Sequence, residues 1–131
     1  MSDDPPIRID RLDHFVLTVR DVEASCRFYE RVLGLKIVRW EGRTALHCGR
    51  QKINLHQAGR EFEPKAAKPT PGSGDFCLIT ETPLEEVERH LAACNVAIEH
   101  GPVPKEGALG AMRSVYFRDP DDNLVEVSNY L

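Results

Sequence analysis

The chain contains one segment twice, and this internal repeat constrains its fold more than any other feature of the sequence. Residues 14–37 align with residues 75–98 at a constant offset of 61 positions, without a gap. The alignment places His14 over Asp75. A duplicated fold sets equivalent residues symmetrically around an internal axis, where a shared pocket can use groups from both copies. We therefore expect function near this pair.

The first copy predicts a βαβββ module over about residues 10–57. Residues 11–19 alternate as a strand, Asp21 caps a helix whose apolar residues recur at helical spacing, and Gly34 ends that helix. Three strand-like runs divided by glycine-containing turns then follow, up to residue 57. Residues 58–74 break the periodicity with three prolines and three glycines, so they connect the modules and suit a lid.

The second copy predicts the same order over about residues 75–131. After a strand that starts at Asp75, Thr82-Pro83-Leu84-Glu85 predicts a capping box with proline at the first helical position. Three more strands are expected around residues 97–102, 112–119 and 123–130, with a turn at residues 119–123. Residues 102–111 are expected to be irregular and mobile. The prediction is an α+β fold of two tandem βαβββ modules.

Length and charge exclude several classes of protein. The 131 residues suit one domain. The 17 Lys and Arg against 21 Asp and Glu, without a basic run, argue against a nucleic-acid partner. No apolar stretch approaches the roughly 18 residues of a membrane helix, and the N-terminus has no signal-peptide pattern, so we expect a cytoplasmic protein. The four cysteines lack CxxC spacing, which favours reduced thiols over a disulfide or zinc framework.

Strand alternation groups the polar residues that could do chemistry. Laying residues 53–56 over 125–128 pairs Asn54 with Glu126 and His56 with Ser128. The repeat thus relates four positions: His14, Asn54, Asp75 and Glu126. An imidazole and two carboxylates are a plausible metal site, and an oxygen-rich set favours manganese or magnesium over zinc. The alternative is that backbone groups satisfy the histidine and the aspartate, and that Glu126 is solvated or ion-paired.

A second group lies on the strand expected around residues 112–119. Ser114 and Tyr116 share a face and could donate hydrogen bonds to an anionic ligand, helped by Arg113. Alternatively, Tyr116 is a core residue with a satisfied hydroxyl. The sequence shows no serine or cysteine nucleophile with a local activating base, no glycine-rich phosphate loop and no dinucleotide fingerprint.

Several of these segments resemble the vicinal oxygen chelate superfamily, which includes glyoxalase I, extradiol dioxygenases, fosfomycin-resistance transferases and bleomycin-binding proteins. The similar stretches are DHFVLTVRDVEASCRFYERVLGL and YFRDPDDNLVEVSNY, and the resemblance covers about residues 10–130. QKINLHQAGREFEPKAA and PGSGDFCLITETPLEEV are more similar still to the lineage of glyoxalase domain-containing protein 5. The resemblance implies curved mixed sheets around a central cavity, and a homodimer.

The resemblance also implies roles for individual residues. His14 matches the first-strand histidine of metal-using members and Glu126 the last-strand glutamate, with Asp75 as the third metal ligand. Asp75 stands where a second histidine is usual, and Asn54 stands where glyoxalase I has a glutamate, which argues against glyoxalase I activity itself. His56 shares a strand face with Asn54 and could complete the site.

Three functions follow from the resemblance and its departures. The first is a lyase, isomerase or dioxygenase-like enzyme in which a divalent metal (manganese, iron, nickel, zinc or magnesium) chelates vicinal oxygens of a small oxygenated metabolite as a Lewis acid. In this enzyme His56 or Asp75 shuttles a proton, and Asn54, Arg113, Ser114 and Tyr116 contact substrate. The second is a metal-free small-molecule binder of the bleomycin-resistance type. The third is an interaction protein with a vestigial pocket.

Overall fold

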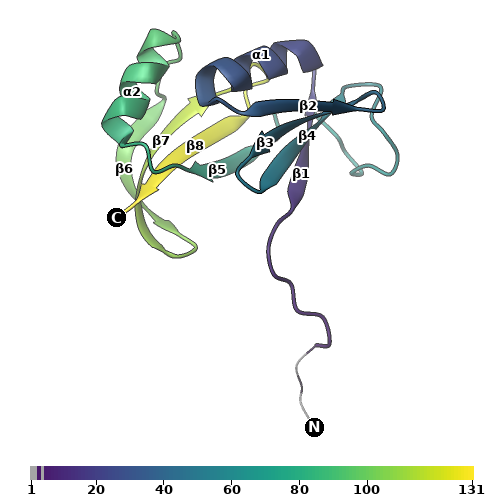
Figure 1. The fold of residues 1–131 in the computed structure, drawn as a ribbon, viewed down its shortest axis with the longest axis horizontal. Helices are drawn as coiled ribbons and strands as arrows, with labels where there is room; N and C mark the ends of the chain where they lie inside the picture. Colours follow the sequence, from purple (N-terminus) through teal and green to yellow (C-terminus); the bar gives the residue numbers. More distant parts are fainter. Residues whose placement is uncertain (1–2, 4) are drawn as a thin grey trace.

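The computed structural model describes residue 3 and residues 5–131, which form two sheets of four strands with one helix each (Figure 1). The first module contains β1 (His14–Val19), α1 (Val22–Leu33), β2 (Lys36–Trp40), β3 (Arg43–Cys48) and β4 (Gln51–Gln57). The second contains β5 (Asp75–Ile79), α2 (Leu84–Ala93), β6 (His100–Gly107), β7 (Gly110–Arg118) and β8 (Leu124–Tyr130). The predicted α+β fold of two tandem βαβββ modules is confirmed.

The two sheets have the same topology. Sheet A has the strand order β1-β4-β3-β2 and sheet B the order β5-β8-β7-β6. In each, the first strand of the module runs parallel to the last, and the remaining pairs are antiparallel. Val16 pairs with Asn54 in sheet A, and Cys77 pairs with Glu126 in sheet B. Val16 and Cys77 are equivalent residues of the repeat, 61 positions apart. The two sheets therefore share the same register between their first and last strands.

The two helices begin in different ways. The carboxylate of Asp21 accepts a hydrogen bond from the Ala24 N–H at 3.1 Å, as predicted, and Gly34 ends α1 in a left-handed conformation with φ 67°. The capping box predicted at Thr82 is wrong. Pro83 is the N-cap and has no side-chain cap, while Asn129 Oδ1 on β8 accepts the Leu84 N–H at 3.0 Å. A residue distant in sequence thus caps α2.

The segment expected to be irregular, residues 102–111, instead forms most of a β-hairpin. β6 and β7 pair from Lys105–Met112 to Gly107–Gly110, with a shift of register between His100 and Val103. β6 is the edge strand of sheet B, and an edge strand tolerates prolines because one side of its backbone has no partner strand. The prolines in this segment are therefore compatible with the strand.

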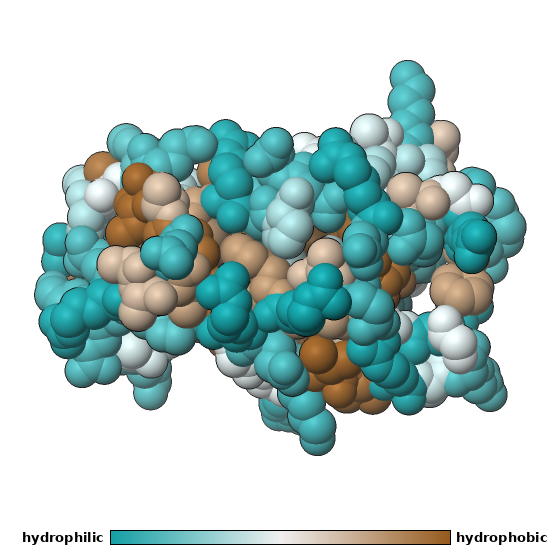
Figure 2. All heavy atoms as spheres, turned by 90° about the horizontal axis from the view of Figure 1, so that it is seen from above, coloured by the Kyte–Doolittle hydropathy of each residue, from teal (hydrophilic) through white to brown (hydrophobic). Residues whose placement is uncertain are grey.

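Both helices pack on the same side of the sheets and share one core. Phe28 on α1 packs against Tyr29 and Phe117, with ring centroids 5.3 and 6.3 Å away, so the helix of the first module touches a strand of the second. Seen from above, the surface is mostly hydrophilic, with apolar residues gathered in a few patches (Figure 2). No helix in the described part of the chain is long and apolar enough to span a membrane.

Candidate functional site

The face of sheet B that the helices do not cover, its open face, carries a hydrogen-bonded cluster around Glu126. Ser128 Oγ donates to Glu126 Oε2 at 3.2 Å. Ser114 Oγ lies 2.6 Å from Ser128 Oγ, and Cys77 Sγ lies 3.3 Å from the same atom. Because a hydroxyl has one proton to donate, Ser128 accepts from Ser114 and Cys77 while it donates to the carboxylate. The donors of the cluster are thus directed toward Glu126.

Tyr116 lies beside this carboxylate, since β7 pairs it directly with Glu126. Burial, and secondarily the negative charge of Glu126, raise the pKa of Tyr116 to about 12, so its hydroxyl stays protonated near neutral pH. Burial also raises the pKa of the Cys77 thiol, which argues against a thiolate nucleophile at this position. The open face therefore offers a carboxylate acceptor and a neutral phenol donor side by side.

A hollow of about 420 Å³ lies over this cluster. Its polar lining includes Glu126, Tyr116 and Lys105, and Lys105 Nζ lies 5.6 Å from the centre of the Tyr116 ring. Its apolar lining includes Ile79, Met112 and Tyr130. This combination of apolar walls with a few polar groups is typical of small-molecule sites.

The open face of sheet A presents the other predicted residues. His14 is exposed, and its Nδ1 lies 2.7 Å from Asp13 Oδ2. Asn54 Oδ1 is buried and has no hydrogen-bond partner among the described residues, which is uncommon for a buried carbonyl oxygen. His56 is buried, and its ring meets the Phe62 ring at a centroid distance of 5.6 Å. Burial, followed by the charge of Arg43, lowers the pKa of His56, so its imidazole is neutral at pH 7.

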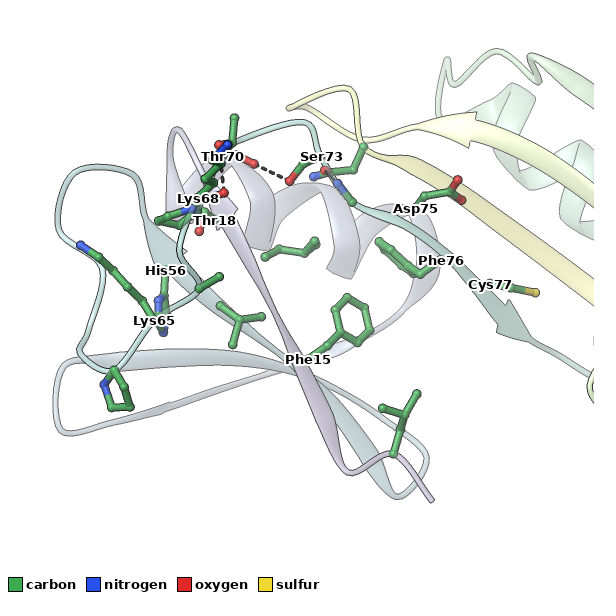
Figure 3. A pocket seen from close by; sticks show the side chains of 18 residues that line it. Phe15, Thr18, His56, Lys65, Lys68, Thr70, Ser73, Asp75, Phe76 and Cys77 are labelled. Atoms are coloured by element: carbon green, nitrogen blue, oxygen red, sulfur yellow. Dashed lines mark hydrogen bonds between the residues drawn. The ribbon is translucent and has the colours of Figure 1, made fainter. Parts of the chain in front are cut away.

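A larger cavity of about 900 Å³ lies between β1, β5 and the connecting loop of residues 58–74 (Figure 3). Phe15 and Phe76, equivalent residues of the repeat, meet there with ring centroids 5.0 Å apart. Asp75 and Cys77 point away from this aromatic pair, toward the side of sheet B. At this point the modules meet through an aromatic contact, while His56 from sheet A and Asp75 and Cys77 from sheet B also line the cavity.

The structure thus brings some predicted residues together and separates others. Ser114, Tyr116 and Glu126 share the open face of sheet B with Asp75, whereas His14, Asn54 and His56 lie on sheet A. Within the described residues, no three or more His, Cys, Asp and Glu side chains are placed to hold a metal ion. A single chain does not assemble the predicted metal ligands.

Arg113 does not join the other predicted substrate contacts. It alternates with Ser114 along β7 and so occupies the helix-bearing face, where its Nη1 lies 3.7 Å from Glu85 Oε1 on α2. Sequence reasoning also missed Cys77 as a neighbour of the cluster. Its alternation with Asp75 was visible, but its contact with Ser128 depends on the β5–β8 register, which sequence alone did not establish.

Two βαβββ modules with polar open faces define the vicinal oxygen chelate fold. The sequence profile of the Glyoxalase/Bleomycin resistance protein/Dioxygenase superfamily matches residues 11–127. The chain belongs to this superfamily.

Relatives with similar sequences support this assignment. Virulence protein STM3117 of Salmonella typhimurium is 52% identical over 124 residues, which cover 94% of this chain and 86% of that protein. Its crystal structure superposes with a TM-score of 0.94 over 95% of this chain and 100% of that one. Glyoxalase domain-containing protein RDO1 of Mycosarcoma maydis is 45% identical, covering 95% of this chain and 70% of that protein. A lactoylglutathione lyase from Agrobacterium tumefaciens is 30% identical, with a TM-score of 0.69 over 96% of each chain.

Proposed function

We propose that this protein is a metal-dependent enzyme of the vicinal oxygen chelate type, acting as a homodimer on a small oxygenated metabolite. The observation that carries the proposal is the position of Glu126. The hydroxyl cluster donates to this carboxylate at the edge of a 420 Å³ hollow, although no cation of the protein is paired with it among the described residues. A carboxylate oriented in this way is suited to a ligand.

The donor set fits a divalent metal only when two chains contribute to it. Asp75 and Glu126 face the same side of neighbouring strands in sheet B, while His14 belongs to sheet A and does not reach them within one chain. We propose that His14 of a second copy completes the set. One imidazole and two carboxylates suit manganese, magnesium or iron.

The charges of the two open faces support this pairing of copies. One row across sheet A joins His14, Lys52, His47 and Lys36. On sheet B, the neighbouring positions carry Asp75 and Glu126. A face with two lysines placed against a face with two carboxylates is electrostatically favourable and fixes the orientation of the copies. Each dimer would then hold two equivalent sites.

Within such a site, the chain's own residues bind and orient the substrate. Tyr116 donates a hydrogen bond because its pKa of about 12 keeps the phenol protonated. Asn54 supplies an acceptor that has no partner in the described part of the chain, and the neutral imidazole of His56 can take up a proton. Asp75 can shuttle a proton where it is not a ligand. The metal, when bound, acts as a Lewis acid on vicinal oxygens.

The superfamily contains enzymes, and the relative from Agrobacterium tumefaciens is named as one. Because Asn54 and Asp75 replace a glutamate and a histidine at the equivalent positions, we expect no glyoxalase I activity. Within the superfamily, we place the chain near the lineage of glyoxalase domain-containing protein 5, on the sequence similarity of residues 51–67 and 71–87.

The first test is elemental analysis of protein purified without a histidine tag. We expect close to one manganese, iron or other divalent metal per chain in the wild type, and little in His14→Ala or Glu126→Gln. His47→Ala is the matched control, because His47 lies on the same open face as His14 and carries the same side chain. Metal retained by both His14→Ala and Glu126→Gln would contradict the proposal.

Mixing the two variants tests whether the site forms between chains. A dimer of one His14→Ala chain and one Glu126→Gln chain has one site with both substitutions and one with neither. After random exchange, half of the dimers are hybrid, so metal should recover to about a quarter of the wild-type content. A site made within one chain gives no recovery.

The alternative function is a metal-free small-molecule binder of the bleomycin-resistance type. The separation of His14 from Asp75 and Glu126 within one chain favours it. In this case the three side chains make hydrogen bonds to the ligand. The binder predicts that a ligand raises the melting temperature equally with and without a chelator, whereas the enzyme loses that stabilisation when metal is removed.

A further inference from the structure

The segment that precedes β1 is an extended arm that leaves the body of its own chain (Figure 1). We call residues 5–13 the N-terminal arm. Its three large aliphatic side chains are almost fully exposed: Ile7 at 73%, Ile9 at 83% and Leu12 at 70%. Apolar side chains exposed together on one short segment favour contact with another surface.

Only the base of the arm is held by its own chain. The Gln51 side chain donates a 2.9 Å hydrogen bond to the Leu12 carbonyl, and the Lys52 N–H donates to the Asp13 carbonyl at 3.3 Å. The pair Arg11–Asp10 lies within the arm itself. Among the described residues, no hydrogen bond or ion pair ties Ile7, Arg8 or Ile9 to the body of the protein. The direction of the arm is fixed at its base, where Leu12 borders the 900 Å³ cavity of its own chain, while Ile7 and Ile9 stay 73% and 83% exposed.

We propose that the N-terminal arm of one copy lies across the open face of sheet B in a second copy and closes the hollow beside Glu126. The placement rests on the proposed function, in which His14 of one copy meets Glu126 of another. Because the arm leads directly into His14, it must pass over the sheet that carries this glutamate.

The spacing of apolar residues matches on the two sides. An extended chain rises about 3.3 Å per residue, so Leu12 lies about 7 Å and Ile9 about 17 Å from His14. On sheet B, Ile79 pairs with Ser128, about 7 Å beyond Glu126 along β8, and Tyr130 follows at about 13 Å. Leu12 therefore reaches the level of Ile79, and Ile9 lies about 4 Å beyond the level of Tyr130.

The two ends of the open face differ in chemistry, which selects the direction of the arm. One end begins with Asp75 and Arg118. The other end is apolar and exposed, with Ile79 at 52% and Leu109 at 87%, and Met112 and Tyr130 line the hollow between them. An arm with three aliphatic side chains fits the second end. It then supplies a wall that the hollow lacks in a single chain.

The first test is cross-linking between copies by a short bismaleimide. Ile9→Cys combined with Tyr130→Cys should form a covalent dimer, because position 9 lies within about 4 Å of the level of Tyr130, which lines the hollow. Ile9→Cys without the second substitution should remain single chains, since the native Cys77 lies about 17 Å from position 9. Arg27→Cys, on the exposed side of α1, is the control for random collisions and should also give no specific dimer.

The second test measures association by analytical ultracentrifugation. Ile9→Asp should raise the dissociation constant of the dimer about tenfold or more, because a buried isoleucine is replaced by a charge. Arg8→Asp is the matched control, since neighbouring side chains of an extended segment point to opposite sides. Both variants should keep the circular dichroism of the wild type because both residues are outside the core.

The outcomes separate this inference from the proposed function, since neither test needs metal. A wild-type protein that stays monomeric overturns the inference. An Ile9→Asp dimer as tight as the wild type, without a link from position 9 to position 130, overturns it too, even if the protein binds metal. A specific link in protein that binds no metal supports the arm while the enzyme proposal fails.

Discussion

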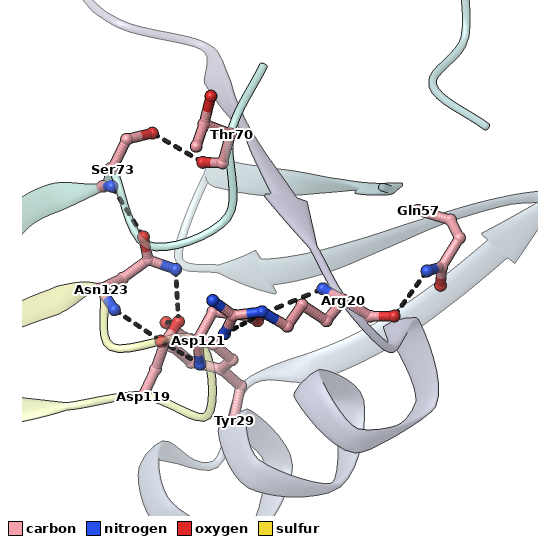
Figure 4. A network of polar contacts seen from close by, with 9 residues as sticks. Arg20, Tyr29, Gln57, Thr70, Ser73, Asp119, Asp121 and Asn123 are labelled. Atoms are coloured by element: carbon pink, nitrogen blue, oxygen red, sulfur yellow. Dashed lines mark hydrogen bonds and ion pairs between the residues drawn. The ribbon is translucent and has the colours of Figure 1, made fainter. Parts of the chain in front are cut away.

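The hydroxyl of Tyr29, on α1 of the first module, donates a 2.6 Å hydrogen bond to Asp119 Oδ2, in the turn between β7 and β8 of the second (Figure 4). Asp119 also accepts from the backbone N–H groups of Asp121 and Asn123, each at 2.9 Å, and from Asn123 Nδ2 at 2.8 Å. Burial and the neighbouring charge of Asp119 raise the pKa of Tyr29, which keeps its hydroxyl a donor. One buried carboxylate therefore joins the two modules.

Removing this hydroxyl should destabilise the whole fold. We expect Tyr29→Phe to lower the free energy of unfolding by about 1.5–3 kcal/mol, the range for a hydrogen bond to a charged group. Urea denaturation measures the change. Tyr130→Phe is the control: among the described residues, its oxygen accepts only the N–H of exposed Leu109, at 3.2 Å, so the change should stay within about 0.5 kcal/mol. Equal effects of the two substitutions would show that the Tyr29 bond has no special role.

The same turn holds two further segments that precede β5 in the chain. Arg20, at the end of β1, donates its backbone N–H to Asp121 Oδ1 at 3.0 Å, and Gly74 donates its own to Asn123 Oδ1 at 2.7 Å. From the sequence, residues 119–123 were predicted only to join two strands. Their contacts with Arg20 and Tyr29 join residues 101 and 90 positions apart, so no local pattern could reveal them.

The cap of α2 gives a second prediction. Asn129 Oδ1 accepts the Leu84 N–H, and its Nδ2 donates to the Thr80 and Thr82 carbonyls at 2.8 and 2.9 Å. Asn129→Ala should lower the free energy of unfolding by about 1–2 kcal/mol, as for other lost caps. Thr82→Ala, at the position predicted from the sequence to be the cap, should change it by less than about 0.5 kcal/mol. A larger loss of stability for Thr82→Ala than for Asn129→Ala in urea denaturation would instead support the capping box predicted from the sequence.

The sequence predicted the fold better than the site, for a physical reason. The helix start at Asp21, its end at Gly34 and the strand periods are local signals. Because the repeat predicts the same element order twice, the prediction for one module also supported the prediction for the other. The site depends on strand register and on which face each residue takes. Arg113, predicted to help Ser114 and Tyr116 bind an anionic ligand, lies on the opposite face of β7 from them, beside Glu85.

The turn also contains a testable backbone strain. Asp122 has φ 67°, in the left-handed region that glycine adopts most easily. Asp122→Gly should therefore raise the free energy of unfolding by about 0.5–1 kcal/mol, and Asp122→Ala should lower it by about the same amount. Thermal denaturation of the Asp122→Gly and Asp122→Ala variants measures both changes in stability. If both substitutions destabilise the protein, the Asp122 side chain contributes more than its backbone costs.

The buried imidazole of His56 predicts a dependence of stability on pH. Its pKa lies below the ordinary value of 6.5, mainly because of burial and secondarily because of Arg43. As the pH falls through about 6.5, His56 becomes protonated in the unfolded chain while the buried imidazole of the folded chain stays neutral. The contribution of His56 to stability is complete above this pH and is lost as the pH falls below it.

We expect His56→Gln to remove this part of the pH dependence. The difference in melting temperature between wild type and variant should be constant from pH 8 to 7 and shift in favour of the variant toward pH 5. His14→Gln is the control, because its ring is exposed. A wild-type curve that stays parallel to the His56→Gln curve below pH 6.5 would contradict the assigned cause.

The last prediction concerns the hydroxyls that point toward Glu126. Ser128 is completely buried and donates to Glu126 Oε2, while Ser114 contacts only Ser128 in this cluster. If Glu126 is a metal ligand, Ser128 positions it, and loss of such a partner typically weakens metal binding tenfold or more. We therefore expect Ser128→Ala to weaken manganese binding about tenfold, and Ser114→Ala to have a smaller effect, by isothermal titration calorimetry.

Urea denaturation of the same variants separates positioning from folding. Both serines are fully buried, so both substitutions should cost comparable stability, about 1 kcal/mol, while only Ser128→Ala removes a direct contact with the carboxylate. Unequal metal affinities at equal stability indicate that the contact orients Glu126. Wild-type affinity in Ser128→Ala, with binding lost in Glu126→Gln, would mean that the glutamate binds metal without help from the hydroxyls.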